Sequence, residues 1–470
     1  MTINTTTRGG EGSAEDALRL LESRNTRLVS IFGSLDESGA KRVHYIADVN
    51  REYRIISVRI TGALPSATLI SPAAAWHERE LHDQYGIEID GHPDLRPLMS
   101  HPAEYRFLQV QGVGVCELPV GPVHAGIIEP GHFRFSVMGD SVLHLEPRLF
   151  YTHKGTEKLL EGTSIIDGPA LAESVSGDNC FAHAVAYCQS VENAFGISVP
   201  PRGRAIRLIG LELERMMAHI ADAGALCGDV GCVVPAAYTA RIKESLLRAS
   251  ARCFGTRFWR GIATPGGVRR DLSAESAREF GNAVAHAAAD FAEMARIVLD
   301  TPSVLNRFEG TGILSNKIAR DFGAVGPVAR ASGVRIDVRH DHPYGHYRNI
   351  TVETLHFQQG DVLSRARMRI EETRVSSRLI QDTLNDLAAG IISTRMPRNG
   401  SAEGFSAVES PRGELLYWIR IRNGRIARCH IKSPSFQNWP GLPFAVAGNI
   451  SADFPLINKS FNLSYSGCDR

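Results

Sequence analysis

The stretch Ser174-Val175-Ser176-Gly177-Asp178-Asn179-Cys180-Phe181-Ala182-His183 stands at the start of the longest helical part of this sequence. From about Glu173 to Val298 the apolar residues recur with the period of an α-helix, interrupted only at Thr264-Pro265-Gly266-Gly267. A further long helix is predicted from Val362 to Leu387. These runs predict a core of long helices in the second part of the chain.

Ahead of the helical part, the sequence predicts a small α/β unit. The alternation from Tyr53 to Ile60 is typical of a strand, and the run from Ala73 to Tyr85 predicts a helix that ends at Gly86. Six prolines between positions 93 and 130 place the domain linker in that segment. Beyond about Arg395 we expect short strands and turns.

These patterns together predict an α+β fold with two domains. The predicted boundaries are 1–14 for a disordered lead-in, 15–105 for the small α/β domain, 106–120 for the linker and 121–470 for the large domain. The large domain is expected to have a core of long helices with small β-sheets at its periphery. The lead-in is polar and has no apolar core segment, so it is not a secretory signal.

Composition narrows the function classes. The chain of 470 residues has 52 Lys and Arg against 51 Asp and Glu, which argues against nucleic acid or an anionic membrane as the main partner. No run of about 18 apolar residues is present, so we predict no membrane span. The 8 cysteines form no Cys-x-x-Cys pair, which predicts reduced thiols in a cytosolic protein and no iron–sulfur cluster held by this chain.

Motifs spread along the sequence resemble two related families. Trp76-His77-Glu78-Arg79-Glu80 and Gly91-His92-Pro93-Asp94-Leu95-Arg96 resemble the signature of the smaller hydrophilic subunit of respiratory complex I. From Gly121 onward the chain resembles the large quinone-site subunit of complex I. It is still more similar to the large subunit of energy-converting, membrane-bound [NiFe] hydrogenases of the formate hydrogenlyase type. The runs that carry this second resemblance include Gly121-Pro122-Val123-His124, Glu129-Pro130-Gly131-His132-Phe133-Arg134, Glu212-Leu213-Glu214-Arg215, Pro411-Arg412-Gly413-Glu414 and Asn438-Trp439-Pro440.

The chain is therefore identified as a fusion of the small and large hydrophilic subunits. The resemblance implies a [NiFe]-hydrogenase-large-subunit-like domain, with a cavity at the interface with a small iron–sulfur subunit. It implies a membrane-associated complex related to NADH:quinone oxidoreductase, with antiporter-like membrane subunits, on the cytoplasmic face of the inner membrane. Electrons would pass from a [4Fe-4S] cluster in the partner to a quinone-like acceptor, coupled to ion translocation. The expected partners include no nucleic acid.

The sequence departs from the hydrogenase pattern at the metal. Such hydrogenases hold nickel and iron with two Cys-x-x-Cys pairs, and the four positions read Ser176, Asn179, Ser464 and Gly467 here. Because nickel and iron need soft thiolates, we expect no metal centre, no cofactor bound by this chain other than a quinone, and no hydrogenase activity. The chain stops at Arg470 without the tail that such hydrogenases lose after metal insertion, which agrees with this expectation.

The neighbouring thiols do not restore the missing ligands. Cys180 and Cys468 each lie one residue past a ligand position, and one residue of helix turns a side chain by about 100°. The tyrosine with which complex I binds the quinone corresponds to Gly177. We therefore predict that a quinone-like ligand would be lined by Gly177 and by the four substituted positions.

Three residues are predicted to handle protons, each with a structural alternative. Glu129 lies where the hydrogenase family keeps a proton-passing carboxylate, but it could be a loop residue in solvent. His132 follows on a predicted strand, and His183 could be a core histidine with its polar atoms satisfied. On a nearby predicted helix, four charged residues share one face at 3-4-3 spacing and could pair with one another, namely Glu212, Arg215, His219 and Asp222.

Loss of both the thiolates and the quinone tyrosine leaves a second hypothesis open. The chain could be a non-catalytic coupling or scaffold subunit of such a complex, in which the cavity transmits a signal and no electrons pass. Quinone binding to the purified complex, and its loss on Glu129→Gln or His183→Ala, distinguishes the two.

Overall fold

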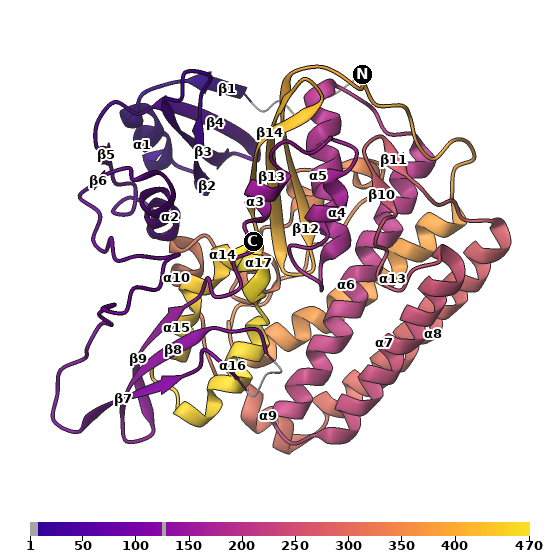
Figure 1. Ribbon diagram of the computed structural model, residues 1–470. Helices are drawn as coiled ribbons and strands as arrows, with labels where there is room; N and C mark the ends of the chain where they lie inside the picture. The colour runs from indigo at the N-terminus through magenta and orange to yellow at the C-terminus, as the bar shows by residue number, and fades with distance from the viewer. Residues whose placement is uncertain (1–7, 125–127) are drawn as a thin grey trace.

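The computed structural model describes residues 8–124 and 128–470, and its first part is a four-stranded sheet with helices packed on it (Figure 1). The strands are β1 (Arg8–Glu11), β2 (Thr26–Leu35), β3 (Lys41–Val49) and β4 (Glu52–Arg59), in the order β1-β4-β3-β2. Only β1 runs parallel to its neighbour. The helices are α1 (Ala14–Glu22) and α2 (Ala75–Tyr85), and the short pair β5 (Leu64–Pro65) and β6 (Ile89–Asp90) completes the domain.

The start of the chain is more ordered than the sequence suggested. Strand β1 lies inside the segment 1–14 that was predicted as a disordered lead-in, and Ser13 caps α1 by accepting the backbone N–H of Asp16. The disordered lead-in is therefore wrong for residues 8–13, because β4 offers a free edge that the polar segment pairs with through its backbone. The rest of that prediction, residues 1–7, lies outside the described residues.

The connection between the domains ends earlier than predicted. Residues 91–114 contain no regular element, but β7 (Val115–Val120) pairs with β8 (His132–Met138), which pairs with β9 (Ser141–Arg148). Residues 115–120 thus belong to a three-stranded sheet of the large domain, and the linker prediction is wrong for them. Pro119 had indicated a loop, but the residue lies in an edge strand, where a missing N–H is tolerated.

Long helices form the core of the large domain, as predicted. They are α5 (Cys180–Phe195), α6 (Pro201–Asp229), α7 (Val233–Phe254), α8 (Ala274–Leu299) and α13 (Val362–Asn385), and the hairpin β10 (Ala263–Thr264) and β11 (Gly267–Val268) interrupts them. Helix α6 packs against α7 and α13, and α8 packs against both of those (Figure 1). Helix α5 instead lies against the sheet of β12 (Ala402–Ser410), β13 (Gly413–Arg422) and β14 (Arg425–Lys432).

The end of the chain is helical, whereas the sequence suggested strands and turns throughout. Helices α14 (Pro434–Asn438), α15 (Leu442–Val446), α16 (Phe454–Phe461) and α17 (Tyr465–Asp469) follow β14 and return the C-terminus to the centre of the molecule (Figure 1). The remaining short helices connect the larger elements. They are α3 (Thr156–Leu160), α4 (Gly168–Ala172), α9 (Pro302–Phe308), α10 (Asn316–Asp321), α11 (Gly326–Ala331), α12 (Val338–Asp341) and the 3₁₀ turns Pro72–Ala74, Gly345–Asn349, Trp439–Gly441 and Ser451–Asp453.

Buried ion pairs join the two domains. Glu414 of β13 accepts hydrogen bonds from Arg27 of β2 at 2.7 and 2.9 Å, from Tyr53 at 2.8 Å and from Lys432 at 2.9 Å. The side chains of Glu414 and Lys432 are fully buried. Since a buried charge needs its partner, this cluster fixes the small domain on the large one.

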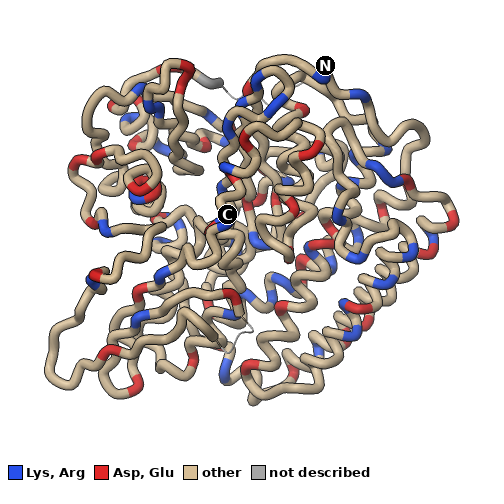
Figure 2. The backbone as a smooth tube through the Cα atoms, viewed as in Figure 1, with Lys and Arg blue, Asp and Glu red and all other residues tan. Residues whose placement is uncertain are grey.

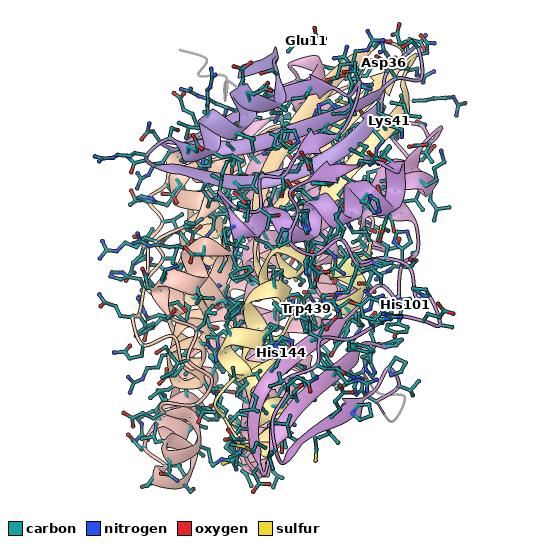
Figure 3. The ribbon with its side chains drawn as sticks, turned by 90° about the vertical axis from the view of Figure 1, so that its left-hand side faces the viewer. Glu11, Asp36, Lys41, His101, His144 and Trp439 are labelled. Carbon is teal, nitrogen blue, oxygen red and sulfur yellow. The ribbon has the colours of Figure 1, made fainter. Side chains whose placement is uncertain are left out.

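The predicted α+β class is confirmed, but not every small sheet is peripheral, because the sheet β12–β14 is largely buried against α5. Lys, Arg, Asp and Glu are interspersed along the chain (Figure 2), in agreement with the near-zero net charge. Viewed from the side, the small domain with Asp36 and Lys41 lies at one end of the molecule, and His144 and Trp439 lie in the other half (Figure 3). Among the described residues, none of the helices combines the length and apolar character needed to cross a bilayer.

Candidate functional site

Two segments from distant parts of the chain meet in front of helix α5. Ser176 precedes α5, and Ser464 caps the N-terminus of α17 by accepting the backbone N–H of Gly467 at 2.9 Å. The two hydroxyl oxygens are 2.9 Å apart although 288 positions separate the residues. The structure therefore brings together the cavity residues predicted at the two ends of the large domain, and we call this cluster of Ser176, Asp178, Asn179, Ser464 and Gly467 the cradle.

Backbone geometry explains the glycine in the cradle. A Cβ atom on Gly467 would lie 2.9 Å from the Ser464 hydroxyl oxygen and 3.0 Å from its Cβ, so the capped turn leaves no room for a side chain. Gly177 is different, because a Cβ there would meet only the guanidinium of Arg260, at 3.9 Å. Position 177 is thus open toward the space in front of α5.

Arg412, which was not predicted as a site residue, points into the cradle from the turn between β12 and β13. Its Nη2 atom lies 2.5 Å from the Asp178 carboxylate, its Nε donates to the carbonyl of Asn462, and its buried Nη1 has no hydrogen-bond partner among the described residues. The only signal for it was the run Pro411-Arg412-Gly413-Glu414, quoted for the resemblance. Although burial alone would raise the pKa of Asp178, the Arg412 charge and the Ser176 hydroxyl, at 2.5 Å, hold it below its ordinary value.

Asn179 has an unsatisfied side chain. It is 2% exposed, makes no capping bond to α5, and its Oδ1 atom has no hydrogen-bond partner in the described parts of the chain. The next side chain turns away as expected, because the Cys180 thiol donates to the carbonyl of Phe258 at 3.3 Å. The cradle therefore holds two buried polar atoms that a ligand could satisfy, a donor on Arg412 and an acceptor on Asn179.

Glu129 also reaches this region. One of its carboxylate oxygens accepts the backbone N–H of Ser466 at 2.9 Å, which ties the loop before β8 to helix α17. The residue is exposed, so it contacts both solvent and the C-terminal side of the cradle. Glu129 is therefore a solvent-exposed loop residue, as the structural alternative expected, and its bond to Ser466 places it beside α17.

The two predicted histidines lie on different elements. His183 is on the first turn of α5, fully buried, with Nδ1 2.8 Å from the Tyr417 hydroxyl, and burial lowers its pKa to about 3. His132 is on β8, where Nδ1 lies 3.2 Å from the Gly121 carbonyl oxygen, and burial lowers its pKa too. Both imidazoles are therefore neutral near pH 7. Neither imidazole forms a hydrogen bond to a cradle residue among the described contacts, although the backbone N–H of His183 donates to the carbonyl of Asn179 at 3.2 Å. The structure therefore places Glu129 and the backbone of His183 beside the cradle and leaves His132 apart from it.

A further carboxylate lies at the start of α5. Glu214 of α6 accepts the backbone N–H of Phe181 at 2.7 Å and that of Ala182 at 3.0 Å, and burial raises its pKa to about 8. The residue thus carries a proton near neutral pH, one turn of helix from the cradle. Sequence reasoning placed it only in a family motif.

The charged stripe on α6 is buried, but its members pair mainly with other helices. Arg215 lies 3.2 Å from Glu212, as the spacing suggested. His219 instead lies 2.8 Å from Glu372, and Asp222 lies 2.9 Å from Arg369. The expected pairing within the stripe is therefore wrong for these two residues, because α13 packs on the same face and supplies the opposite charges.

The cradle does not suit a nickel–iron centre. The four positions that the resemblance equates with thiolate ligands carry two hydroxyls, an amide and no side chain at all. These are not the soft ligands that nickel and iron require. The described residues also contain no group of three or more His, Cys, Asp or Glu placed to hold a metal ion.

Comparisons with known proteins agree with this architecture. The family model described as respiratory-chain NADH dehydrogenase, 30 Kd subunit, matches residues 12–108, and that of the 49 Kd subunit matches residues 229–403 and 391–470. Hydrogenase-4 component G of Escherichia coli (strain K12) is 34% identical over 435 residues, which is 86% of this chain and 76% of that protein. Formate hydrogenlyase subunit 5 of the same strain is 34% identical over 473 residues, which is 92% of this chain and 82% of that protein. NADH-quinone oxidoreductase subunit 4 of Thermus thermophilus is 30% identical over 403 residues, or 80% and 98%.

The relatives are hydrophilic subunits of oxidoreductase complexes, and the two family models match the small and the large domain of this chain respectively. The chain therefore belongs to the family that unites the 30 Kd and 49 Kd subunits of respiratory-chain NADH dehydrogenase with related hydrogenase subunits, and it carries both kinds of subunit sequence in one polypeptide.

Proposed function

We propose that this chain is the hydrophilic subunit of a membrane-associated redox complex, and that its cradle binds the carbonyl end of a quinone-like acceptor instead of a nickel–iron centre. The observation that carries the proposal is the buried Nη1 of Arg412, which has no partner within residues 8–124 and 128–470, near the paired hydroxyls of Ser176 and Ser464. A ligand carbonyl would accept this N–H, and a buried donor left without a partner costs about 1–3 kcal/mol.

The charges around the cradle favour reduction of such a ligand. Reduction of a quinone to a quinol takes two electrons and two protons, and negative charge develops on the carbonyl oxygen before the protons arrive. The Arg412 guanidinium would stabilise that charge through a charge-assisted hydrogen bond. Electrons would come from a [4Fe-4S] cluster in a small iron–sulfur subunit, since the cradle itself holds no redox group.

Protons would reach the cradle through Glu129 and, from the other side, through Glu214. Glu129 is exposed and bonded to the N–H of Ser466, so it can exchange protons with water. Glu214 is protonated near pH 7 because burial raises the pKa of its carboxyl group. We assign His183 to support of helix α5 through its bond to Tyr417, because its neutral, buried ring cannot take up a proton near neutral pH.

The complex would also include antiporter-like membrane subunits, with this chain on the cytoplasmic face of the inner membrane. Names of the relatives support a multisubunit assembly, since each is called a component or subunit. The coupled process would be ion translocation.

A second candidate function is favoured by one feature of the cradle. The Ser464 oxygen accepts from Gly467, and the Ser176 hydroxyl donates to Asp178, so these groups satisfy one another without a ligand. A subunit of this kind could couple its partners mechanically without passing electrons. Its cradle would then stay closed.

The experiment that decides is performed on the complex purified from native membranes through a tag on this chain. Co-purification of an iron–sulfur subunit and antiporter-like subunits comes first, followed by quinone binding and quinone reduction. The test variants are Arg412→Lys and Glu129→Gln. The matched control is Arg420→Lys, which alters an arginine of β13 that pairs with Glu403 outside the cradle.

If the proposal holds, Arg412→Lys weakens quinone binding by about tenfold or more, because the oriented N–H of Arg412 Nη1, the free donor of the cradle, is lost. Glu129→Gln would then slow turnover without weakening binding, and Arg420→Lys would match the unsubstituted complex. Unchanged binding and turnover in both test variants would sink the catalytic proposal and favour the coupling subunit. Recovery of the chain without partners would refute both.

A further inference from the structure

A pocket open to solvent lies away from the cradle, between helix α5, the start of α6 and the 3₁₀ turn Gly345–Asn349. Its cavity measures about 80 Å³. The floor is made by Leu208, Leu211 and the rings of Tyr344 and Tyr347, and the rim carries the polar side chains of Gln189, Asn193 and Ser198. Four nitrogen-bearing side chains also line it, namely Arg204, Arg207, His346 and Arg348, together with the carboxylate of Glu192, which is bonded to Arg207.

The arginines of α6 differ in how they are satisfied. Arg202 bonds the Asp271 carboxylate at 2.7 Å and two backbone carbonyls, and Arg207 forms a two-bond pair with Glu192 at 2.5 and 2.9 Å. Arg204, which lies between them, makes no ion pair within residues 8–124 and 128–470, and its buried Nε has no hydrogen-bond partner. Of these three arginines near the start of α6, Arg202 and Arg207 have carboxylate partners and Arg204 has none among the described residues.

His346 and Arg348, on the 3₁₀ turn, also have few hydrogen-bond partners among the described residues. The Nδ1 atom of His346 is buried and has no partner in the described parts of the chain, and Arg348 bonds only the carbonyl of Pro343, at 3.1 Å. Burial lowers the pKa of His346 and of Arg348, and the charge of Arg204 lowers both further. Asp386 raises the pKa of His346 but forms no bond to it among the described residues. The Glu192 carboxylate in the lining is already bonded to Arg207, so among the described residues Arg204 and Arg348 have no carboxylate partner of their own.

We propose that this cavity binds one small oxyanion of the phosphate type. Guanidinium groups hold phosphate through paired N–H bonds, and the imidazole and the rim amides offer further donors to a tetrahedral group. A carboxylate has only two oxygens and would leave some of these donors unused. The volume admits one such group and excludes a quinone ring with its tail.

The proposal gives the site a connection to the interior of the large domain. The Tyr347 hydroxyl on the cavity floor donates to Glu212 at 2.5 Å, and the Tyr344 hydroxyl accepts the backbone N–H of Glu409 at 3.1 Å. Both carboxylates belong to the buried ion-pair cluster between α6, α13 and β12. A bound anion would therefore lie directly over the tyrosines that close this cluster. Its binding does not require the redox role proposed for the cradle.

The test is a titration of the purified full-length protein with inorganic phosphate by calorimetry, at constant ionic strength and with acetate as the comparison anion. The key variants are Arg204→Gln, in the wall of the cavity, and Arg348→Gln, at its exposed rim. The matched control is Arg202→Gln. It also removes one positive charge, two residues from Arg204, but the guanidinium that it removes is already bonded to Asp271. Circular dichroism and a thermal melt establish that each variant is folded.

We expect saturable binding of one phosphate per chain, weakened about tenfold or more by Arg204→Gln and by Arg348→Gln, and changed less than about twofold by Arg202→Gln. Three results would overturn the proposal. The first is no heat at about 10 mM phosphate, where a site with a Kd of about 1 mM would be mostly filled. The second is equal weakening of phosphate binding by all three variants, which would indicate general electrostatic attraction to the positive charges of this region and not a specific site. The third is acetate binding as tightly as phosphate, which would make this a carboxylate site. If Arg204→Gln does not fold, Arg348→Gln decides alone.

Discussion

A cysteine pair at Ser176 and Ser464 would test the geometry on which the proposed function rests. Their hydroxyl oxygens are 2.9 Å apart, and a disulfide requires the two sulfurs to be about 2.05 Å apart, so they must approach by about 0.9 Å more. Both residues lie at helix N-termini, one before α5 and one at the cap of α17, where a turn can adjust without breaking a helix. We expect the double variant Ser176→Cys/Ser464→Cys to form this bond on mild oxidation.

The expected gain in stability follows from the length of chain that the bond closes. With 288 positions between the residues, the chain-entropy relation gives about 5–6 kcal/mol at 25 °C, and measured disulfides typically give about 2–4 kcal/mol. The substitutions also remove the Ser176–Asp178 and Gly467–Ser464 hydrogen bonds, at about 1 kcal/mol each. The oxidised double variant should therefore be more stable than the reduced double variant by about 2–4 kcal/mol, while the reduced double variant should be less stable than wild type by about 2 kcal/mol.

The measurement combines a count of free thiols with urea unfolding under oxidising and reducing conditions, in buffer containing a chelator. Wild type has 8 thiols, so the double variant should show the same 8 after oxidation and two more after reduction. The single variants control for pairing with the adjacent native residues Cys180 and Cys468, and each should keep its added thiol free. If all added thiols of the double variant stay free after oxidation, the two segments do not meet as described and the cradle is refuted.

Three further perturbations test other parts of the molecule. Glu414→Gln should lower the free energy of unfolding by about 3–5 kcal/mol, because it leaves Lys432 buried without its counter-charge and Arg27 with only Asp48, at 3.3 Å. Adding Lys432→Met should recover part of the loss in urea titrations, and a cost below about 1 kcal/mol would mean that these ion pairs do not hold the domains together. Gly224→Ala should lower the free energy of unfolding by about 1–3 kcal/mol, because its Cβ would overlap the Thr239 side chain where α6 meets α7. Adding Thr239→Ala should restore stability, and an unchanged melting temperature in Gly224→Ala would contradict this close approach. The pKa of His183 is about 3 in the folded protein and about 6.5 in the unfolded chain, so the native state binds fewer protons and stability falls as pH drops between these values. The free energy of unfolding should fall by about 2 kcal/mol at pH 5. If the urea midpoint of His183→Gln shows the same pH dependence as wild type, this reasoning is refuted.

The long helices could be predicted from sequence because their signal is local. Apolar period and a closing Gly or Pro mark α5 to α8 and α13 in the residues of each helix itself. The short helices after β14 were missed for the same reason. Each of α14, α15 and α17 has five residues, too few for a period to emerge, and their positions depend on packing against β9 and β13 and on one another.

The cradle could be predicted only through the family motifs that name its positions. Spacing alone gives no reason to place Ser176 beside Ser464, since the contact spans 288 positions. Arg412 was missed as a site residue because an arginine after a proline in a turn is typical of a surface loop. Its burial depends on Asp178 and the carbonyl of Asn462, which reach it from two other parts of the chain. The cross-domain cluster around Glu414 has no sequence signal for the same reason.

Hydroxyls at two thiolate positions change what the cradle can hold. A thiolate pair left without metal would place like charges side by side, so such a site depends on its metal for stability. Ser176 and Ser464 instead share one hydrogen bond with each other. The Ser176 hydroxyl also donates to Asp178, and the Ser464 oxygen also accepts the N–H of Gly467. Protein groups therefore satisfy both hydroxyls, and the cradle atoms without a partner in the described parts of the chain are neutral or cationic, on Asn179 and Arg412. A neutral ligand with an acceptor oxygen fits that remainder, whereas a cation would face the guanidinium, and this difference is why we favour a carbonyl ligand for this chain.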